Sequence, residues 1–112
     1  MPLSTHVLDA VTGAPAAGVS ITLRRRADAA TRPAISRAIT GPDGRIADLA
    51  ANLEPGDYQL VIDSEGYFAK QSYIETPFYP EIVITFRVVA ADARYHLPVL
   101  LSPFGYSTYR GS

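Results

Sequence analysis

The sequence contains no cysteine. This absence excludes disulfide bonds, cysteine-ligated zinc and cysteine nucleophiles, and it fits a reducing compartment. No stretch reaches the roughly 20 consecutive apolar residues that cross a membrane as a helix. The N-terminus also lacks the basic segment and the apolar segment of an export signal. We therefore expect a cytoplasmic protein that makes no contact with a membrane.

An excess of charge of either sign is missing as well. Lysine and arginine total 10, aspartate and glutamate total 11, and the net charge is −1. A surface that binds nucleic acid or anionic lipid needs a positive patch, so neither partner is predicted. The one basic run, at residues 24–26, is interpreted as a solvated strand end in preference to a phosphate site.

Motifs of several common enzyme classes do not occur. The sequence has no Gly-x-Ser-x-Gly nucleophile elbow, no phosphate-binding glycine loop and no His-Glu-x-x-His metal motif. Two histidines alone are a thin basis for a metal site. These residues therefore predict no metal site.

The pattern that is present predicts an all-β chain. A length of 112 residues is typical of one domain, so residues 1–112 are expected to form a single unit. Short segments that alternate apolar and polar residues, separated by turn signals, are typical of a sandwich of two sheets around one core. The one helix expected is 64–72, with Ser64 as its N-cap. The eight strands expected are 2–9, 19–23, 35–40, 45–49, 58–63, 81–88, 95–101 and 106–110.

Strand alternation separates a core face from a polar face near the C-terminus. His96, Pro98 and Leu100 share one face of their strand, and the residues between them form the apolar, core-facing side. In the next strand Tyr109 and Arg110 fall on opposite faces. Pro98 predicts an edge strand or a bulge, because proline cannot donate to a ladder. The face with His96 is therefore either a solvent face or the wall of a site.

Five polar residues are candidates for chemistry. A histidine pair suits proton transfer near neutral pH, and a guanidinium binds a planar, oxygen-rich ligand through a fixed fork of donors. A serine is a weak nucleophile unless a base lies next to it. Each of these side chains also has an ordinary interpretation as a surface residue, and the sequence pattern alone leaves both interpretations open. The candidates are His6, Arg45, His96, Arg110 and Ser112.

Three blocks of the sequence resemble one known family. They are Leu-Ser-Thr-His-Val-Leu-Asp at 3–9, Asp-Gly-Arg at 43–45, and the segment 95–112, which ends in Tyr-Arg-Gly-Ser. The resemblance is to the 5-hydroxyisourate hydrolases, the transthyretin-like proteins of urate breakdown. The final tetrapeptide is the most specific part, because transthyretins share the Leu-Leu-Ser-Pro run but lack that ending.

The resemblance implies a fold, an assembly and a reaction. The fold is a transthyretin-like sandwich of two four-stranded sheets with one short helix, and the assembly is a homotetramer, a dimer of dimers. The reaction is cofactor-free hydrolysis of the cyclic amide 5-hydroxyisourate to 2-oxo-4-hydroxy-4-carboxy-5-ureidoimidazoline in urate and purine degradation. The implied catalytic residues are His6, Arg45, His96 and Ser112, and the implied substrate-binding residues are Arg45, Tyr109 and Arg110.

Two other functions compete with the hydrolase. One is a transthyretin-type binding protein that holds an aromatic ligand without chemistry, and the other is a structural sandwich domain without a site. The Tyr-Arg-Gly-Ser ending favours the enzyme, as does a histidine at His6 in place of the lysine typical of the carriers. Within the implied site, the histidines handle water and protons and Arg45 stabilises an oxyanion. Ser112 orders the water or a histidine through its hydroxyl or its terminal carboxylate.

Overall fold

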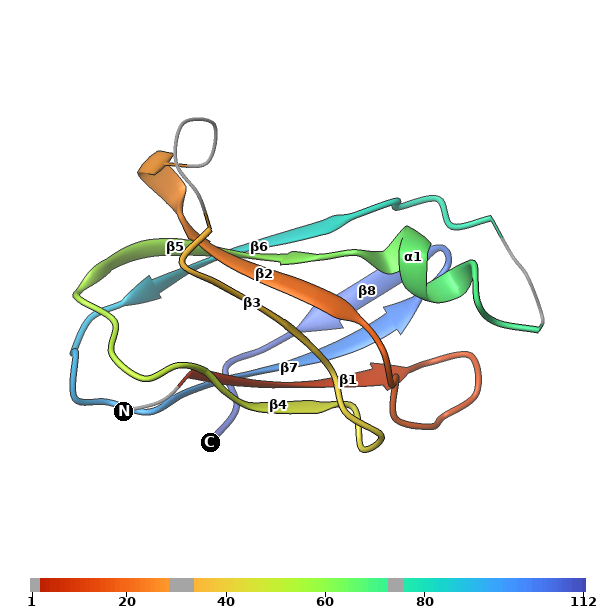
Figure 1. Cartoon of the computed structure of the whole chain (residues 1–112), viewed down its shortest axis with the longest axis horizontal. Coiled ribbons are helices and arrows are strands. Elements are labelled where there is room, and N and C mark those ends of the chain that lie inside the picture. The colour runs from red at the N-terminus through yellow and green to blue at the C-terminus, as the bar shows by residue number, and fades with distance from the viewer. Residues whose placement is uncertain (1–2, 29–33, 73–75) are drawn as a thin grey trace.

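The computed structural model describes residues 3–28, 34–72 and 76–112. Two four-stranded sheets pack face to face, which confirms the predicted all-β sandwich with one short α-helix (Figure 1). The strands are β1 (Leu3–Asp9), β2 (Ser20–Arg25), β3 (Ser36–Ile39), β4 (Arg45–Ala50), β5 (Gly56–Ile62), β6 (Ile82–Val88), β7 (Tyr95–Ser102) and β8 (Gly105–Thr108). The helices are the α-helix α1 (Ser64–Phe68) and the 3-10 helix η1 (Arg26–Asp28).

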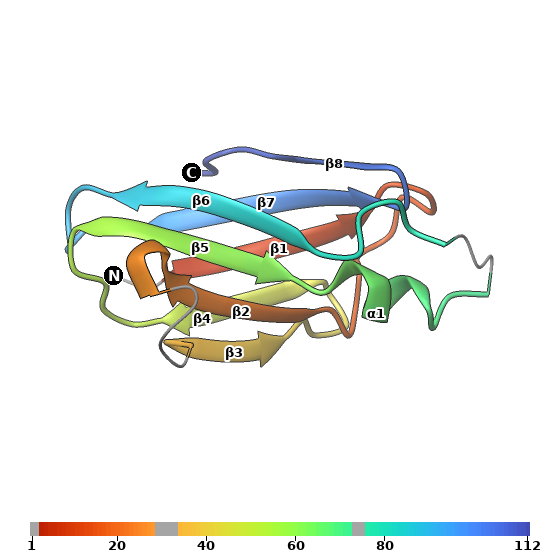
Figure 2. The same ribbon diagram turned by 90° about the horizontal axis from the view of Figure 1, so that it is seen from above.

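The sheet that carries the candidate residues has the strand order β4-β1-β7-β8. Strands β1 and β7 are parallel neighbours, and the other pairs of this sheet are antiparallel. Figure 2 shows β1 and β7 side by side at the centre of this layer, with β4 and β8 flanking them. The central pair therefore joins the first strand to the seventh, which are far apart in the sequence.

The second sheet has the order β3-β2-β5-β6, and the core lies between the two layers. Alternate residues of each central strand are buried, as the period-two pattern predicted. The largest fully buried side chains come from both sheets and from α1, and they include Tyr58, Phe68, Leu3, Ile21, Leu60 and Leu101. His6 of β1 and His96 of β7 alternate with these buried residues and consequently lie on the outer face of their sheet, whereas Thr5 and Asp9 are buried polar residues of β1.

The helix differs from the prediction at both ends. Asp63, not Ser64, is the N-cap, and its carboxylate accepts a hydrogen bond from the Gly66 N–H at 3.0 Å. The Ser64 hydroxyl instead donates to the Tyr79 carbonyl oxygen at 2.6 Å. The helix ends at Phe68, because Tyr67 and Phe68 are its buried apolar side chains and the amides of Lys70 and Gln71 bond three residues back.

Pro98 lies on an interior strand whose register with β1 is unbroken at this residue, so the predicted edge strand or bulge is wrong. The ladder between β7 and β8 ends at the pair Val99 and Thr108, next to the proline. The Thr108 hydroxyl donates to the Pro98 carbonyl oxygen at 2.8 Å. The missing proline N–H therefore falls where β8 has already ended, and β8 is shorter than the predicted strand 106–110 for the same reason.

A tight turn before β4 places the first residue of that strand beside β1. Gly44 has φ of +77° and is buried, and a Cβ at this position would collide with the carbonyl oxygen of Val7. The Val7 N–H donates to the Gly44 carbonyl oxygen at 2.8 Å. Only glycine fits this close approach, and the turn delivers Arg45 to the outer face next to His6.

Candidate functional site

Most of the predicted site residues surround one hollow on the outer face of the β4-β1-β7-β8 sheet. Its volume is about 240 Å³. Residues from β1, β4, β7 and the segment after β8 contribute to its wall. They include His6, Arg45, His96, Tyr109, Gly111 and Ser112.

The strand register explains why residues distant in sequence meet here. His6 is the cross-strand partner of Arg45 on β4 and of Pro98 on β7. Ser4, two residues before His6, is the partner of His96. Cross-strand partners project to the same face of a sheet, so the pairing collects two imidazoles and one guanidinium on the outer face.

The proton position on His6 follows from its hydrogen bond. Its Nε2 lies 3.0 Å from the carbonyl oxygen of Asp43. A carbonyl oxygen only accepts, so Nε2 carries the hydrogen and donates it. The neutral ring then has its lone pair on Nδ1, and this nitrogen is the one able to take up a proton.

The environment of His96 favours its neutral form. The pKa of His96 is lowered from the ordinary value of 6.5, first by burial of the ring and then by electrostatic interaction with Arg45 and with His6. A contact with Ser4 acts in the opposite direction. Nδ1 of His96 lies 2.8 Å from the Ser4 hydroxyl, which leaves Nε2 as the second ring nitrogen for exchange with a ligand. A ring that stays neutral can act as a base at physiological pH.

The segment after β8 folds against His96. The Gly111 N–H donates to the His96 carbonyl oxygen at 2.7 Å, although the regular ladder has already ended. This bond brings Ser112 to the hollow beside His96 and Arg45, and Tyr109 lines the same hollow from further along. The four predicted catalytic residues, His6, Arg45, His96 and Ser112, are therefore neighbours of one cavity.

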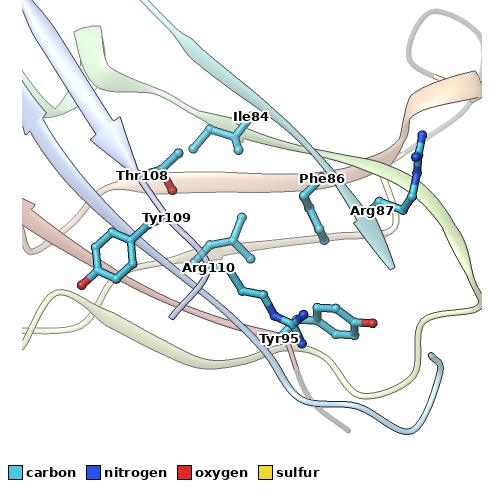
Figure 3. A pocket seen from close by; sticks show the side chains of 8 residues that line it. Ile84, Phe86, Arg87, Tyr95, Thr108, Tyr109 and Arg110 are labelled. Carbon is cyan, nitrogen blue, oxygen red and sulfur yellow. The ribbon is translucent and has the colours of Figure 1, made fainter. Parts of the chain in front are cut away.

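Arg110, which was predicted to bind substrate, lines a different hollow from these four residues. Its guanidinium carbon lies 4.9 Å from the centre of the Tyr95 ring, on the other side of the segment from the hollow. Figure 3 shows Arg110 reaching toward Tyr95 while Tyr109 points away from it. Arg110 and Tyr95 border a second hollow of about 290 Å³, which Ile84 and Phe86 also line. Neighbouring residues of an extended segment point to opposite sides, which separates Arg110 from Tyr109.

The described ranges contain neither a cluster of metal-ligating side chains nor a membrane-spanning helix. Among residues 3–28, 34–72 and 76–112, no three His, Asp or Glu side chains gather as metal ligands. Across the same part of the chain, no helix is long and apolar enough to span a membrane.

The fold and this histidine-bearing face define a transthyretin-like sandwich with a polar site on the outer face of the β4-β1-β7-β8 sheet. The model of the HIUase/Transthyretin family matches residues 3–111. The chain belongs to that family.

The similar proteins include hydrolases and a transthyretin. A 5-hydroxyisourate hydrolase of Mesorhizobium japonicum is 44% identical over 98% of this chain and 91% of its own length. The solved structure of Klebsiella pneumoniae 5-hydroxyisourate hydrolase is 36% identical, with a TM-score of 0.85 over the whole of both chains. The structure of transthyretin from Sparus aurata is 29% identical, with a TM-score of 0.87 over 98% of this chain and 96% of its own. The fold is thus common to both, and identity is higher to the hydrolases.

Sequence reasoning missed three partners of the predicted residues. Ser4 contacts His96, and its place on the His6 face was the only signal that could have indicated it. The Asp43 carbonyl oxygen holds His6, and no side-chain pattern reports a backbone acceptor. Arg94 lies in a neighbouring hollow with Arg45, and its position just before β7 carries no motif of its own.

Proposed function

We propose that this protein hydrolyses 5-hydroxyisourate, opening one ring of the substrate. The observation that carries the proposal is the convergence of His6, His96, Arg45 and Ser112 on one hollow. Relatives of similar length that are 37% to 44% identical to this chain are 5-hydroxyisourate hydrolases. A paired-imidazole site with a guanidinium fits hydrolysis of a flat, oxygen-rich amide.

The reaction adds water across a ring amide. The water oxygen attacks a ring carbonyl carbon, one water proton passes to the histidine pair, and the ring C–N bond breaks. The departing nitrogen takes a proton, and the new carboxylic acid ionises at neutral pH. The proposed product is 2-oxo-4-hydroxy-4-carboxy-5-ureidoimidazoline, and no metal ion or organic cofactor takes part.

Each residue of the hollow receives a proposed role. His6 and His96 activate water and transfer the proton, which neutral imidazoles can do. Arg45 binds the substrate and stabilises the oxyanion that forms at the attacked carbonyl. Ser112 orders the attacking water or a histidine, and Tyr109 packs against the heterocycle.

The proposal extends to assembly, domain organisation and compartment. Residues 1–112 act as one domain, and four copies associate as a dimer of dimers. Support for burial of the outer sheet face comes from Leu8, Pro98 and Leu100, which are apolar and surround the histidines. The enzyme works in the cytoplasm, and a sequence without cysteine fits that reducing compartment.

A direct assay tests the proposal. Freshly generated 5-hydroxyisourate is mixed with the protein, and its ultraviolet absorbance is followed against the spontaneous decay. The proposed enzyme accelerates the decay in proportion to protein concentration. A transthyretin-type carrier would bind the compound or an aromatic analogue and leave the decay rate unchanged, and that result would overturn the hydrolase.

A further inference from the structure

The hollow of the proposed active site continues into a second hollow on the same sheet face. This neighbour has a volume of about 260 Å³, and Arg45, His96 and Ser112 line both. It opens toward Ser4 and Arg94, so Arg94 stands at the far end of a site whose middle is the catalytic group. We call the second hollow the Arg94 lobe.

The combined site is rich in positive charge. Among the described residues that line the two hollows, Arg45 and Arg94 carry two positive charges and no aspartate or glutamate is present, so the carboxylate of Ser112 offsets only one of the two guanidinium charges. Arg45 approaches Asp43 only at 4.0 Å, and both side chains are more than half exposed. Such a contact is weak, so the lobe keeps a positive potential that favours anionic groups.

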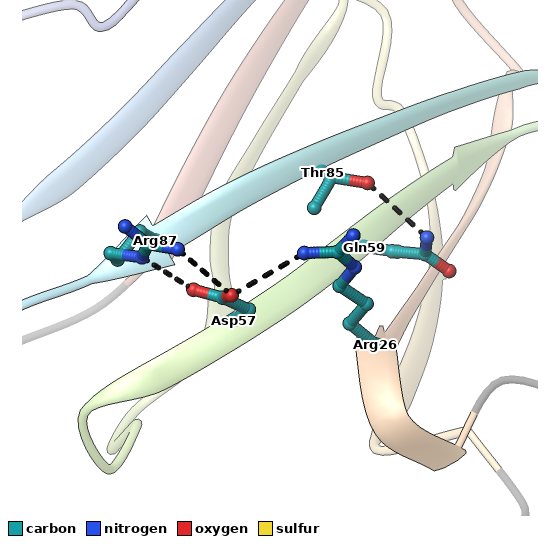
Figure 4. Close-up of polar contacts among 5 residues, drawn as sticks. All are labelled: Arg26, Asp57, Gln59, Thr85 and Arg87. Carbon is teal, nitrogen blue, oxygen red and sulfur yellow. Dashed lines mark hydrogen bonds and ion pairs between the residues drawn. The ribbon is translucent and has the colours of Figure 1, made fainter.

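Two arginines on the other side of the sandwich, on η1 and β6, have their charge compensated by a carboxylate. Arg26 and Arg87 both pair with Asp57, and the Arg87 Nε lies 2.7 Å from its carboxylate (Figure 4). No ion pair of Arg94 is found within the part of the chain that the structure describes. Its guanidinium is therefore available to a ligand in the lobe.

We propose that the Arg94 lobe binds the carboxylate of an anionic ligand, with Arg94 and Arg45 as its two guanidinium contacts. The inference rests on the proposed function for its physiological ligand, because ring opening creates a carboxylate that the substrate lacks. Hydrolysis converts an uncharged ring carbonyl beside Arg45 into that carboxylate. The Arg94 lobe then binds the new carboxylate, and Arg94 determines the specificity of the site for ligands that carry one.

The test uses two commercial probes that differ by one carboxylate. Uracil is a neutral planar imide, and orotate is the same ring with a carboxylate attached. Calorimetric titration at low and moderate salt should show that the native protein binds orotate more tightly than uracil. Arg94→Gln should weaken orotate binding about tenfold and leave uracil binding unchanged, and added salt should reduce the native preference because Arg94 is exposed.

A matched control is Arg37→Gln, because Arg37 is an exposed arginine on β3 of the other sheet. This variant should bind both probes as the native protein does. Equal affinity of the native protein for uracil and orotate would overturn the lobe, as would an orotate preference that survives in Arg94→Gln. Orotate preference lost in Arg94→Gln, in a protein that does not hydrolyse 5-hydroxyisourate, would sustain the lobe and reject the hydrolase.

Discussion

Gly111 lies directly against the ring of His96. A Cβ on residue 111 would stand 2.6 Å from Cδ2 of His96 and 3.1 Å from Cγ of Pro98. Carbon atoms do not approach to 2.6 Å without repulsion, so any side chain at this position forces the imidazole or the terminal segment to move. The glycine therefore positions His96 by contact with the ring edge and by its N–H bond to the His96 carbonyl oxygen.

Gly111→Ala should lower kcat about 10- to 100-fold, because small displacements of a reacting group are costly in rate. The melting temperature should change little, since Gly111 lies outside the core. The pKa of His96, followed by NMR, should move toward its ordinary value as the ring becomes less buried. Gly105→Ala is the control: the nearest atom to its Cβ, the Ser102 Oγ, lies at 3.8 Å, and native turnover is expected. Native kcat in Gly111→Ala would contradict the positioning role.

Replacement of either histidine by asparagine should remove proton transfer. His6→Asn and His96→Asn are each expected to lower kcat by roughly 10²–10⁴, the usual contribution of a general acid or base. Steady-state hydrolysis of 5-hydroxyisourate measures the loss, and thermal unfolding checks that the variants fold. A variant with native turnover would show that its histidine takes no part in the reaction.

The lowered pKa of His96 predicts a pH dependence of both rate and stability. If neutral His96 is the base, kcat/KM should stay high below the ordinary value of 6.5 and fall only as the ring becomes protonated. In the same range the unfolded chain binds the proton more readily than the folded one, so stability is lost as pH falls from 6.5 toward the folded-state pKa. Chemical unfolding of the native protein and of His96→Asn across this pH range measures how much of the pH dependence of stability comes from His96. An identical change of the unfolding free energy with pH in the two proteins would contradict this contribution.

Deletion of residues 109–112 should separate activity from stability. Tyr109 is 61% exposed and Arg110 is exposed, so their removal costs little core. The free energy of unfolding should fall by about 0.5–3 kcal/mol, the range of ordinary substitutions. Turnover should collapse, because Ser112 and Tyr109 leave the hollow and the Gly111 bond to His96 is lost. A folded and fully active deletion variant would remove this segment from the proposed site.

A point substitution at Leu100 tests the proposed tetramer. Leu100 is 38% exposed in the single chain and borders the hollow, so a tetramer would bury it between dimers. Light scattering should give the mass of four chains for the native protein, and Leu100→Glu should yield smaller species because a buried carboxylate is costly. Val89→Glu, at a residue 74% exposed and away from this face, should leave the mass unchanged. A native monomer at micromolar concentration would contradict the assembly.

Much of the sandwich could be predicted because alternation is a local property. The inward residues of β7 were assigned correctly from spacing alone, and the same alternation placed His96 on the opposite face. The turn before Arg45 was also predictable, since Asp43 and Gly44 are typical turn residues.

Strand pairing and local competition could not be predicted in the same way. The parallel register that sets Ser4 beside His96 joins residues 92 apart, and no local pattern specifies it. Asp63 outcompeted Ser64 as helix cap because the serine hydroxyl found the Tyr79 carbonyl, a contact from a distant segment. The placement of Arg110 over the Tyr95 ring could not be predicted either, because membership of a motif does not decide which way a side chain points.

The parallel pairing of β1 with β7 also governs when the site can form during folding. The hairpin of β7 and β8 closes over two residues and is a local, fast event. Its docking on β1 closes a loop of about 90 residues, an entropic cost that slows folding in proteins rich in distant contacts. His96 therefore meets Ser4 and His6 only when the whole sandwich has closed. Recovery of hydrolysis after dilution from denaturant should accordingly follow the slowest phase of refolding, with no activity held by partly folded chains.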